Sequence, residues 1–220
     1  MTTRNEHAAF LETGRYIYEN RATRWITERM HARCANLRQL DLAERTVLDV
    51  GCGEGDHFKY VRRASLIGVD PLSEMLERAE QKHPGRATLL QGSALSLDGL
   101  LAPSSIDSVS CVSVLEHITP IERALDQMAR VLRGDGELIW GIPTEGLLYR
   151  IGRELTTKRH VQKVTGVDYD ALVRSEHVNR CEDIVKALRE RFVVEAMRGI
   201  PFWLSGRVLN VFLVGRCTKR

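Results

Sequence analysis

Glycines and carboxylates alternate in one short segment of the chain, residues 47–56, which reads Val-Leu-Asp-Val-Gly-Cys-Gly-Glu-Gly-Asp. The apolar residues at its start are typical of a buried strand. The three glycines let the following backbone approach a ligand closely, because they carry no side chain. The pattern predicts a strand, a turn that receives a nucleoside-containing cofactor, and then a helix.

The charge of this turn discriminates between cofactors. Dinucleotide-binding turns space their glycines as Gly-x-Gly-x-x-Gly or Ala, whereas the spacing here is Gly-x-Gly-x-Gly and Asp56 occupies the third fingerprint position. Asp49, Glu54 and Asp56 would repel a pyrophosphate, but they suit a cofactor that carries an ammonium and a sulfonium group. The turn is therefore interpreted as a site for S-adenosylmethionine rather than for NAD.

A further carboxylate, Asp70, follows the apolar run Leu66–Val69. At the end of a second strand it can accept hydrogen bonds from both hydroxyl groups of an adenosine ribose. The alternative is a cap for a helix over Leu72–Gln81, since strand-to-helix turns commonly carry Asp. The two interpretations are even for Asp70 alone, and the neighbouring glycine turn favours ribose binding.

Seven short apolar runs and the segments between them predict the framework that positions these side chains. The strands are expected at Thr46–Val50, Leu66–Val69, from Leu89, Ser108–Leu115, Glu137–Ile142, Phe192–Met197 and Val208–Arg216, with a helix near Glu182–Arg191 before the last two. The fold class is α/β: a Rossmann-like, mostly parallel seven-stranded sheet with helices on both faces. In such a sheet the ligand lies at the carboxyl ends of the strands.

Two helices carry clear local signals. Residues Phe10–Leu40 read as a helix, which we interpret as an N-terminal helical cap. Another helix follows the fourth strand. Thr119 is expected as its N-cap, Pro120 in its first turn and Glu122 as the acid of a capping box, and Gly134 is expected to end it.

Composition and charge fit one domain. The 220 residues are 43% hydrophobic and 28% charged with a net charge of +3, so neither a disordered chain nor a nucleic-acid binder is expected. The parts are a helical cap (1–43), a cofactor-binding core (44–143), an acceptor-side segment (144–180) and a C-terminal helix with strands (181–220). Scattered cysteines, a charged N-terminus and the lack of a long apolar run predict a cytoplasmic protein without a membrane span.

These residues resemble the class I S-adenosylmethionine-dependent methyltransferases, especially small-molecule enzymes such as the ubiquinone-pathway O-methyltransferases. The resemblance covers Arg45–Pro143 and rests on four segments in the order that the family has. These segments are Val47–Gly55, Gly68–Asp70, Val112–Ile118 and Arg130–Leu138. The resemblance implies that a methyl group passes from S-adenosylmethionine to a small-molecule acceptor. The acceptor and the oligomeric state stay open.

The resemblance also implies a set of cofactor contacts. The glycine turn passes close to the methionine part, and Arg24 reaches the carboxylate, with Arg21 and Arg29 as alternatives. Many relatives bind the adenine amino group with Asp or Asn after the third strand, where this chain offers Ser93. The expected cofactor-binding residues are Arg24, Asp49, Gly51, Cys52, Gly53, Asp70, Ser93, Ala94, Val112 and Val114.

Proton transfer is expected from the segment after the fourth strand. Some ubiquinone-pathway relatives carry Glu-x-x-Glu-His, which can hold a divalent metal, but this chain has Ser113 at the first Glu, so no metal is expected. Glu116 and His117 remain, and His117 is the candidate general base because imidazole titrates near neutral pH. The alternative is a structural role for both. His177 and His160 are second candidates.

A basic cluster follows the fifth strand, and its members are Arg150, Arg153, Lys158, Arg159 and Lys163. It raises the hypothesis of an anionic acceptor, although a solvated helix face is the more ordinary interpretation. Tyr16 and Tyr18 can close over the cofactor or simply pack in the helical cap. Two other functions stay open: a protein that binds S-adenosylmethionine without catalysis, and a nicotinamide-dependent oxidoreductase on the same fold.

Overall fold

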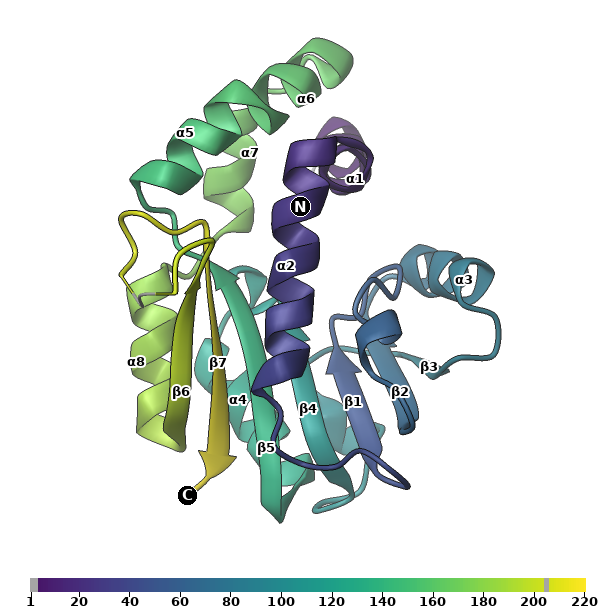
Figure 1. The fold of residues 1–220 in the computed structure, drawn as a ribbon. Coiled ribbons are helices and arrows are strands. Elements are labelled where there is room, and N and C mark those ends of the chain that lie inside the picture. Colours follow the sequence, from purple (N-terminus) through teal and green to yellow (C-terminus); the bar gives the residue numbers. More distant parts are fainter. Residues whose placement is uncertain (1–3, 204–205) are drawn as a thin grey trace.

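A computed structural model describes residues 4–203 and 206–220. Its centre is a seven-stranded sheet in the order β3-β2-β1-β4-β5-β7-β6 (Figure 1). The strands are β1 (Thr46–Val50), β2 (Ser65–Asp70), β3 (Thr88–Gln91), β4 (Ile106–Val112), β5 (Leu132–Pro143), β6 (Phe192–Ile200) and β7 (Phe212–Lys219).

Strand β7 alone reverses the direction of the sheet. It pairs antiparallel with both β5 and β6, whereas the strands from β3 to β5 pair parallel. The expected mostly parallel, Rossmann-like sheet is confirmed. The strand order turns back between β1 and β4, and the crevice at this point is where open α/β sheets bind ligands.

Helices cover both faces of the sheet, and further helices extend beyond its edge. The helices are α1 (Arg4–Glu19), α2 (Arg21–Leu37), α3 (Ser73–Lys82), α4 (Ile121–Val131), α5 (Leu147–Leu155), α6 (Thr157–Thr165), α7 (Tyr169–Glu176) and α8 (Cys181–Arg191), with one-turn 3₁₀ helices η1 (Phe58–Tyr60), η2 (Leu97–Gly99) and η3 (Leu115–His117). Helices α4 and α8 pack on one face, and α2 and α3 on the other.

Two expectations about helices were wrong. The segment Phe10–Leu40 is not one helix, because Asn20 ends α1 and caps α2 by accepting hydrogen bonds from the N–H groups of Ala22 and Thr23. The helix expected after the glycine turn is only the single 3₁₀ turn η1. This turn therefore lacks the long helix whose N-terminal dipole would attract an anion.

The junctions around α4 also differ from the prediction. Strand β4 ends at Val112, since Ser113 adopts a φ of 57° that breaks the extended backbone. Helix α4 begins at Ile121 with Pro120 at the N-cap position and no side-chain cap, so Thr119 lies one residue too early to form the expected capping box. Gly134 lies inside β5 and does not end α4.

The last strand starts later than expected. Residues 208–211 precede β7, because the hairpin register pairs Ile200 with Phe212 and leaves the preceding residues in the connecting loop. Strand β6 correspondingly runs three residues beyond the predicted Met197.

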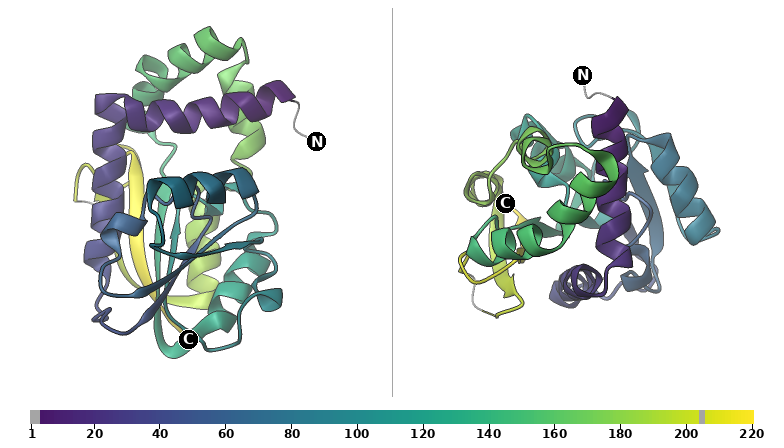
Figure 2. Two further views of the ribbon diagram at one scale, coloured as in Figure 1. Left: turned by 90° about the vertical axis from the view of Figure 1, so that its right-hand side faces the viewer. Right: turned by 90° about the horizontal axis from the view of Figure 1, so that it is seen from above.

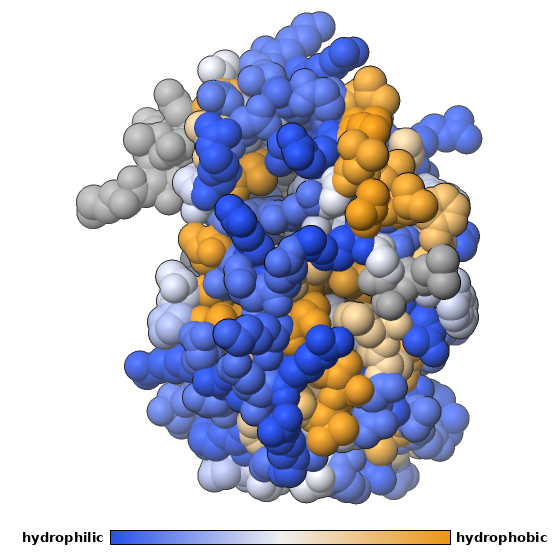
Figure 3. Space-filling view, turned by 90° about the vertical axis from the view of Figure 1, so that its left-hand side faces the viewer, coloured by the Kyte–Doolittle hydropathy of each residue, from blue (hydrophilic) through white to orange (hydrophobic). Residues whose placement is uncertain are grey.

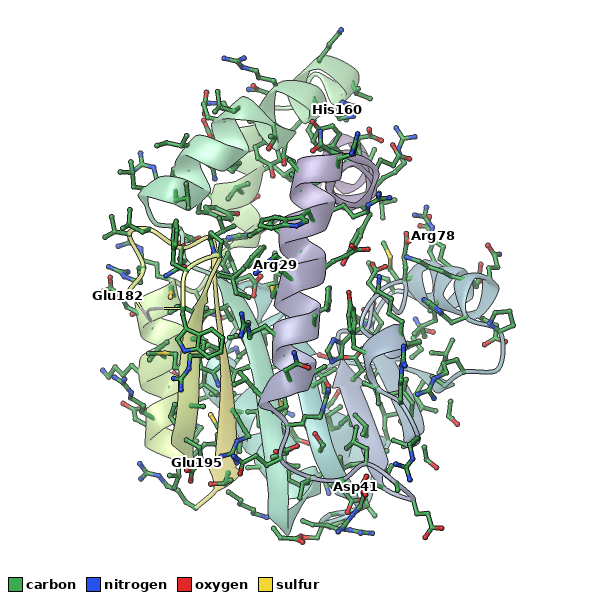
Figure 4. All side chains as sticks on the ribbon, in the orientation of Figure 1. Arg29, Asp41, Arg78, His160, Glu182 and Glu195 are labelled. Atoms are coloured by element: carbon green, nitrogen blue, oxygen red, sulfur yellow. The ribbon has the colours of Figure 1, made fainter. Side chains whose placement is uncertain are left out.

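A helical cap stands over the carboxyl ends of the strands. Helix α1 runs across this edge, and helices α5, α6 and α7 pack beside it (Figure 2). These three helices lie in the expected acceptor-side segment, 144–180. His160 of α6 stacks on Tyr16 of α1 and binds Glu12 with its Nε2 atom 2.8 Å from Oε1 (Figure 4). The second-tier candidate His160 therefore joins two cap helices.

The outer face of the cap carries exposed apolar side chains. Hydrophobic side chains gather in the upper part of the face in Figure 3, and helix α5 exposes Leu147, Ile151 and Leu155 on its surface. Among the described residues, no helix combines the length and the apolar character that a membrane crossing requires.

Asp107 ties three strands together at the edge opposite the cap. Its buried carboxylate accepts hydrogen bonds from the Thr46 N–H (2.9 Å), Arg45 Nη1 (2.8 Å) and Arg133 Nη1 (2.9 Å).

We expect Asp107→Asn to lower the free energy of unfolding by about 2 kcal/mol in urea denaturation, because charge-assisted bonds are lost in a buried place. The exposed Asp98→Asn is the control, and equal stabilities of the two variants would contradict this role.

Candidate active site

The glycine turn follows β1 and adopts backbone angles that favour glycine. Gly51, Gly53 and Gly55 have φ values of 67°, 52° and 77°. A Cβ atom on Gly51 would stand 2.5 Å from a methyl carbon of Val114, whereas a Cβ on Gly53 would meet no atom within 4 Å. The turn is thus closed against Val114 on one side and open at Gly53, where a ligand can approach the backbone.

The end of β2 already uses the hydrogen-bond donors of this turn. The N–H groups of Gly51 and Cys52 donate to the Val69 carbonyl at 2.7 and 3.1 Å, and the Gly53 N–H donates to Asp70 Oδ2 at 3.0 Å. A phosphate-binding turn needs such N–H groups for its ligand. Because these three are occupied, this part of the turn suits a cation better than a phosphate.

Asp70 accepts a backbone hydrogen bond with each of its two carboxylate oxygens. Its Oδ1 accepts from the Leu72 N–H at 3.0 Å, next to the start of α3, while Oδ2 holds Gly53. Burial raises the pKa of Asp70, and the two backbone hydrogen bonds oppose this shift. A carboxylate has about four lone-pair directions, so two remain for ribose hydroxyls.

Asp49 is a buried carboxylate beneath the turn, 3% exposed. Burial raises its pKa to about 7, against the attraction of the Arg38 guanidinium. Among the described residues, Asp49 Oδ2 has no hydrogen-bond partner, and Arg38 Nη1 has none either. A buried oxygen without a donor is costly unless a ligand or water supplies one.

The other two acids of the turn are compensated by basic side chains. Glu54 pairs with Arg78 of α3 at 3.0 Å, on the side of the molecule where Figure 4 labels Arg78, and Asp56 contacts Lys82. From the sequence, Asp49, Glu54 and Asp56 were all expected to favour a positively charged cofactor. Asp49, at the end of β1, is the one of the three for which the described residues provide no salt bridge.

Three predicted cofactor residues lie near the turn with different exposures. Cys52 packs its thiol into the cluster around Phe58, so only its backbone can face a ligand. Ser93 Oγ accepts from the Leu95 N–H at 3.2 Å and keeps its own proton to donate, and Ala94 is buried in the core. Of these three residues, Ser93 is therefore the one with a polar side chain that can still donate.

The other three predicted cofactor residues, Val114, Val112 and Arg24, differ in their surroundings. Val114 lies against Gly51, whereas Val112 packs with Met30 of α2 in a buried cluster. Arg24 is exposed in the first turn of α2. Val114 is therefore at the turn, and the side chain of Val112 belongs to the packing of the helical cap.

The buried Glu116 and the half-buried His117 lie side by side in η3. His117 Nδ1 lies 2.9 Å from the Glu176 carbonyl, which can only accept, so Nδ1 carries the proton and Nε2 the lone pair. Nε2 is 3.9 Å from Glu116 Oε1. Burial lowers the pKa of His117 to about 4, with help from His177, and raises the pKa of Glu116 to about 7.

A second imidazole–carboxylate pair completes this group. The His177 ring stands edge-on to His117 at 5.0 Å between centroids, and its Nδ1 lies 3.0 Å from Glu145 Oε1. Glu145 follows β5 with a φ of 54°, a strained conformation for this residue type. Sequence reasoning missed Glu145, because a lone acid in a loop carries no spacing signal.

The basic cluster is largely used inside the helical cap. Arg153 Nη2 lies 2.8 Å from Asp170 Oδ1, and Lys158 bridges Asp170 and Glu154 at 2.7 and 2.9 Å. These pairs occupy two of the five residues, whose side chains are only 19% exposed, so neither of the two is the solvated helix face of the ordinary interpretation. Within residues 4–203 and 206–220, no three His, Cys, Asp or Glu side chains come together as a metal site.

Comparison with known proteins gives related sequences and folds. Residues 48–140 match a family described as a methyltransferase domain. The mitochondrial ubiquinone biosynthesis O-methyltransferase of Schizosaccharomyces pombe is 26% identical over 165 residues, which cover 72% of this chain and 58% of that protein. The chain spans about half the length of the curated relatives it matches.

Solved structures share the fold over nearly the whole chain. An S-adenosylmethionine-dependent methyltransferase of Thermotoga maritima, described as a possible histamine N-methyltransferase, has a TM-score of 0.62 at 23% identity and covers 93% of this chain and 98% of its own. The [4+2]-cyclase SpnF also has a TM-score of 0.62, at 14% identity, over 87% and 80% of the two chains. Such similarity concerns the fold alone.

The contact between Gly51 and Val114 gives a test of the turn. We expect Gly51→Ala to lower the free energy of unfolding by about 3 kcal/mol and Gly53→Ala by about 1 kcal/mol, because only the first adds a clash to the backbone strain. Urea denaturation measures both. Val114→Ala in the Gly51→Ala background should recover part of the loss, and no recovery would contradict this packing.

Proposed function

We propose that this chain, whose residues 48–140 belong to the methyltransferase domain family, transfers a methyl group from S-adenosylmethionine to a small-molecule acceptor. The observation that carries the proposal is the glycine turn, whose donors are occupied and whose buried Asp49 has an oxygen without a partner among the described residues. An ammonium group is the ligand that such a place accepts most readily.

The residues of the turn fit the parts of this cofactor. Asp49 is the acceptor for the ammonium group, the open backbone at Gly53 receives the methionine chain, and the two remaining lone-pair directions of Asp70 take the ribose hydroxyls. Ser93 Oγ, which accepts from the Leu95 N–H with one lone pair, accepts from the adenine amino group with the other. Arg24 is assigned to the cofactor carboxylate on the family resemblance alone.

When bound, S-adenosylmethionine supplies an electrophilic methyl group on its sulfonium. The chain must then orient the acceptor, exclude water and take up a proton. We assign the proton to the Glu116–His117 pair. Glu116, with a pKa of about 7, can take it up near neutral pH, whereas the lowered pKa of His117, about 4, makes the imidazole a weaker base than expected from the sequence and suits it to relay the proton. His177, with Glu145, stands beside them as a second imidazole.

The segment 144–180 forms the acceptor side of the proposed site. Helices α5, α6 and α7 come from it and close over the strand ends that carry Glu116 and His117. An anionic acceptor would have to use Arg150, Arg159 or Lys163, since Arg153 and Lys158 are paired with Asp170. Charge reversal at all three that leaves the acceptor KM unchanged would remove the anionic preference.

Calorimetry separates the proposal from its two alternatives. We expect the protein to bind S-adenosylmethionine and S-adenosylhomocysteine and to ignore NADH. Binding of NADH instead would favour the oxidoreductase. Binding of S-adenosylmethionine without turnover on phenols, amines or thiols would favour a protein that binds the cofactor without catalysis.

The raised pKa of Asp49, about 7, predicts how cofactor affinity depends on pH. Only the carboxylate attracts an ammonium group, so the proton competes with the ligand. We expect the affinity for S-adenosylmethionine in calorimetry to fall by up to about tenfold per pH unit as the pH drops below 7. Asp49→Asn should remove this dependence, whereas Glu54→Gln, at a half-buried acid of the same turn, should keep it. A slope that survives in Asp49→Asn would contradict the assignment.

The acid–base group predicts a separation between binding and turnover. We expect Glu116→Gln and His117→Gln to lower methyl transfer by about 100-fold or more while the calorimetric affinity for S-adenosylhomocysteine stays within about twofold. The reaction is followed with radiolabelled S-adenosylmethionine on the same acceptors. Equal losses of affinity and turnover would assign both residues a structural role.

A further inference from the structure

A line of buried polar side chains connects the helical cap to the glycine turn. Tyr18 Oη of α1 lies 3.0 Å from His31 Nε2 of α2. His31 Nδ1 lies 3.2 Å from Nδ1 of His57, which follows the glycine turn, and His57 Nε2 lies 3.1 Å from Arg38 Nη2. We call Arg38, His57, His31 and Tyr18 the cap chain.

Chemistry fixes the direction of every hydrogen bond in the cap chain. A guanidinium can only donate, so His57 accepts at Nε2 and carries its proton on Nδ1. His31 must then accept at Nδ1 and carry its proton on Nε2, where it donates to the Tyr18 oxygen. The Tyr18 hydroxyl is left to donate, and Asp56 is the carboxylate of the turn that interacts with it. The two imidazoles are thus neutral and of opposite tautomers.

The ends of the cap chain lie on either side of the turn. At one end Arg38 donates to Ser110 and lies 3.4 Å from Ser108 Oγ, on β4, and its charge faces Asp49 on β1. At the other end Asp56 closes the turn. Polar groups therefore occupy a part of the sheet face where apolar side chains would pack without the desolvation cost of buried polar atoms. This indicates a role beyond packing.

We propose that the cap chain is a positioning device, which holds the glycine turn and α1 in the arrangement that receives the cofactor. The inference rests on the proposed function, because it assigns a role at the same turn. Arg38, His57 and Tyr18 are positioning residues, since each acts on the turn through Asp49 or Asp56. Tyr18, considered from the sequence as a lid or as packing, is the link from α1 to the turn.

Neutral imidazoles agree with the electrostatics of the buried region. Burial lowers the pKa of His31 to about 4, and burial together with Arg38 lowers the pKa of His57 well below its usual value. The charged or titratable groups that face the two rings are Arg38, Asp56, Lys59, Lys82, Glu28, Tyr18 and Tyr60. The folded state takes up no proton here until about pH 4, whereas an unfolded histidine does so near 6.5. The contribution of the cap chain to the free energy of unfolding is therefore complete above pH 6.5 and is lost as the pH falls toward 4.

The tautomers are tested by nitrogen-15 NMR of histidine-labelled protein at pH 7. We expect His57 as the Nδ1–H form and His31 as the Nε2–H form, each assigned by the loss of its signal in His57→Asn or His31→Phe. If His31 and His57 had the same tautomer, or if either ring were cationic, the hydrogen-bond directions assigned to the cap chain would be wrong. This readout needs no cofactor.

The positioning role is tested by calorimetry with S-adenosylhomocysteine on the full chain. Tyr18→Phe removes the link to Asp56, and we expect the dissociation constant to rise about tenfold, as for a lost hydrogen bond to a charged group. Tyr60→Phe is the matched control, because its hydroxyl donates to the Glu28 carbonyl at 3.3 Å outside the cap chain while its ring stacks on His31. We expect this variant to bind like wild type.

The outcomes separate the two proposals. Equal affinities of Tyr18→Phe and wild type would overturn the positioning role and leave the proposed function standing. A wild-type protein that binds neither S-adenosylmethionine nor S-adenosylhomocysteine would remove the proposed function and this role together. Circular dichroism of both variants checks that they fold, and His57→Asn gives a second break in the chain if Tyr18→Phe does not fold.

Discussion

The end of β2 determines what the glycine turn can bind. The Val69 carbonyl and the Asp70 carboxylate take the N–H groups of Gly51, Cys52 and Gly53, which a phosphate would otherwise use. The same contacts bring the turn over Asp49, whose buried oxygen needs a donor. In the proposed function this oxygen receives the ammonium group of the cofactor, and the contacts at the end of β2 thus connect the sheet topology to the proposed choice of cofactor.

Polar contacts in the helical cap follow from that arrangement. Two segments distant in the sequence, α1 with α2 and the region after β5, meet over the strand ends, where buried imidazoles and carboxylates face each other. His117 and His177 belong to the group proposed for proton transfer, whereas around His31 and His57 the directions of the hydrogen bonds are fixed by Arg38. Histidine thus serves two different tasks on the two sides of the turn.

The sequence predicted what depends on local pattern. The seven strands, the glycine turn and the relation to methyltransferases are confirmed, because alternation of apolar runs and the order of four segments are visible in one dimension. The break at Asn20 and the start of α4 at Ile121 were missed, since one residue of cap geometry decides them. The partners of His57 and Glu145 could not be predicted, because the groups that contact them are distant in the sequence.

A crystal structure of the complex with S-adenosylhomocysteine would show whether the glycine turn and Asp49 receive a positively charged adenosine derivative. We expect the amino group of the ligand within hydrogen-bond distance of Asp49 and its ribose hydroxyls on Asp70. The N–H groups of Gly51, Cys52 and Gly53 should still be bound to the end of β2. A ligand whose amino group lies away from Asp49, or a turn that releases those N–H groups to bind a phosphate, would contradict it.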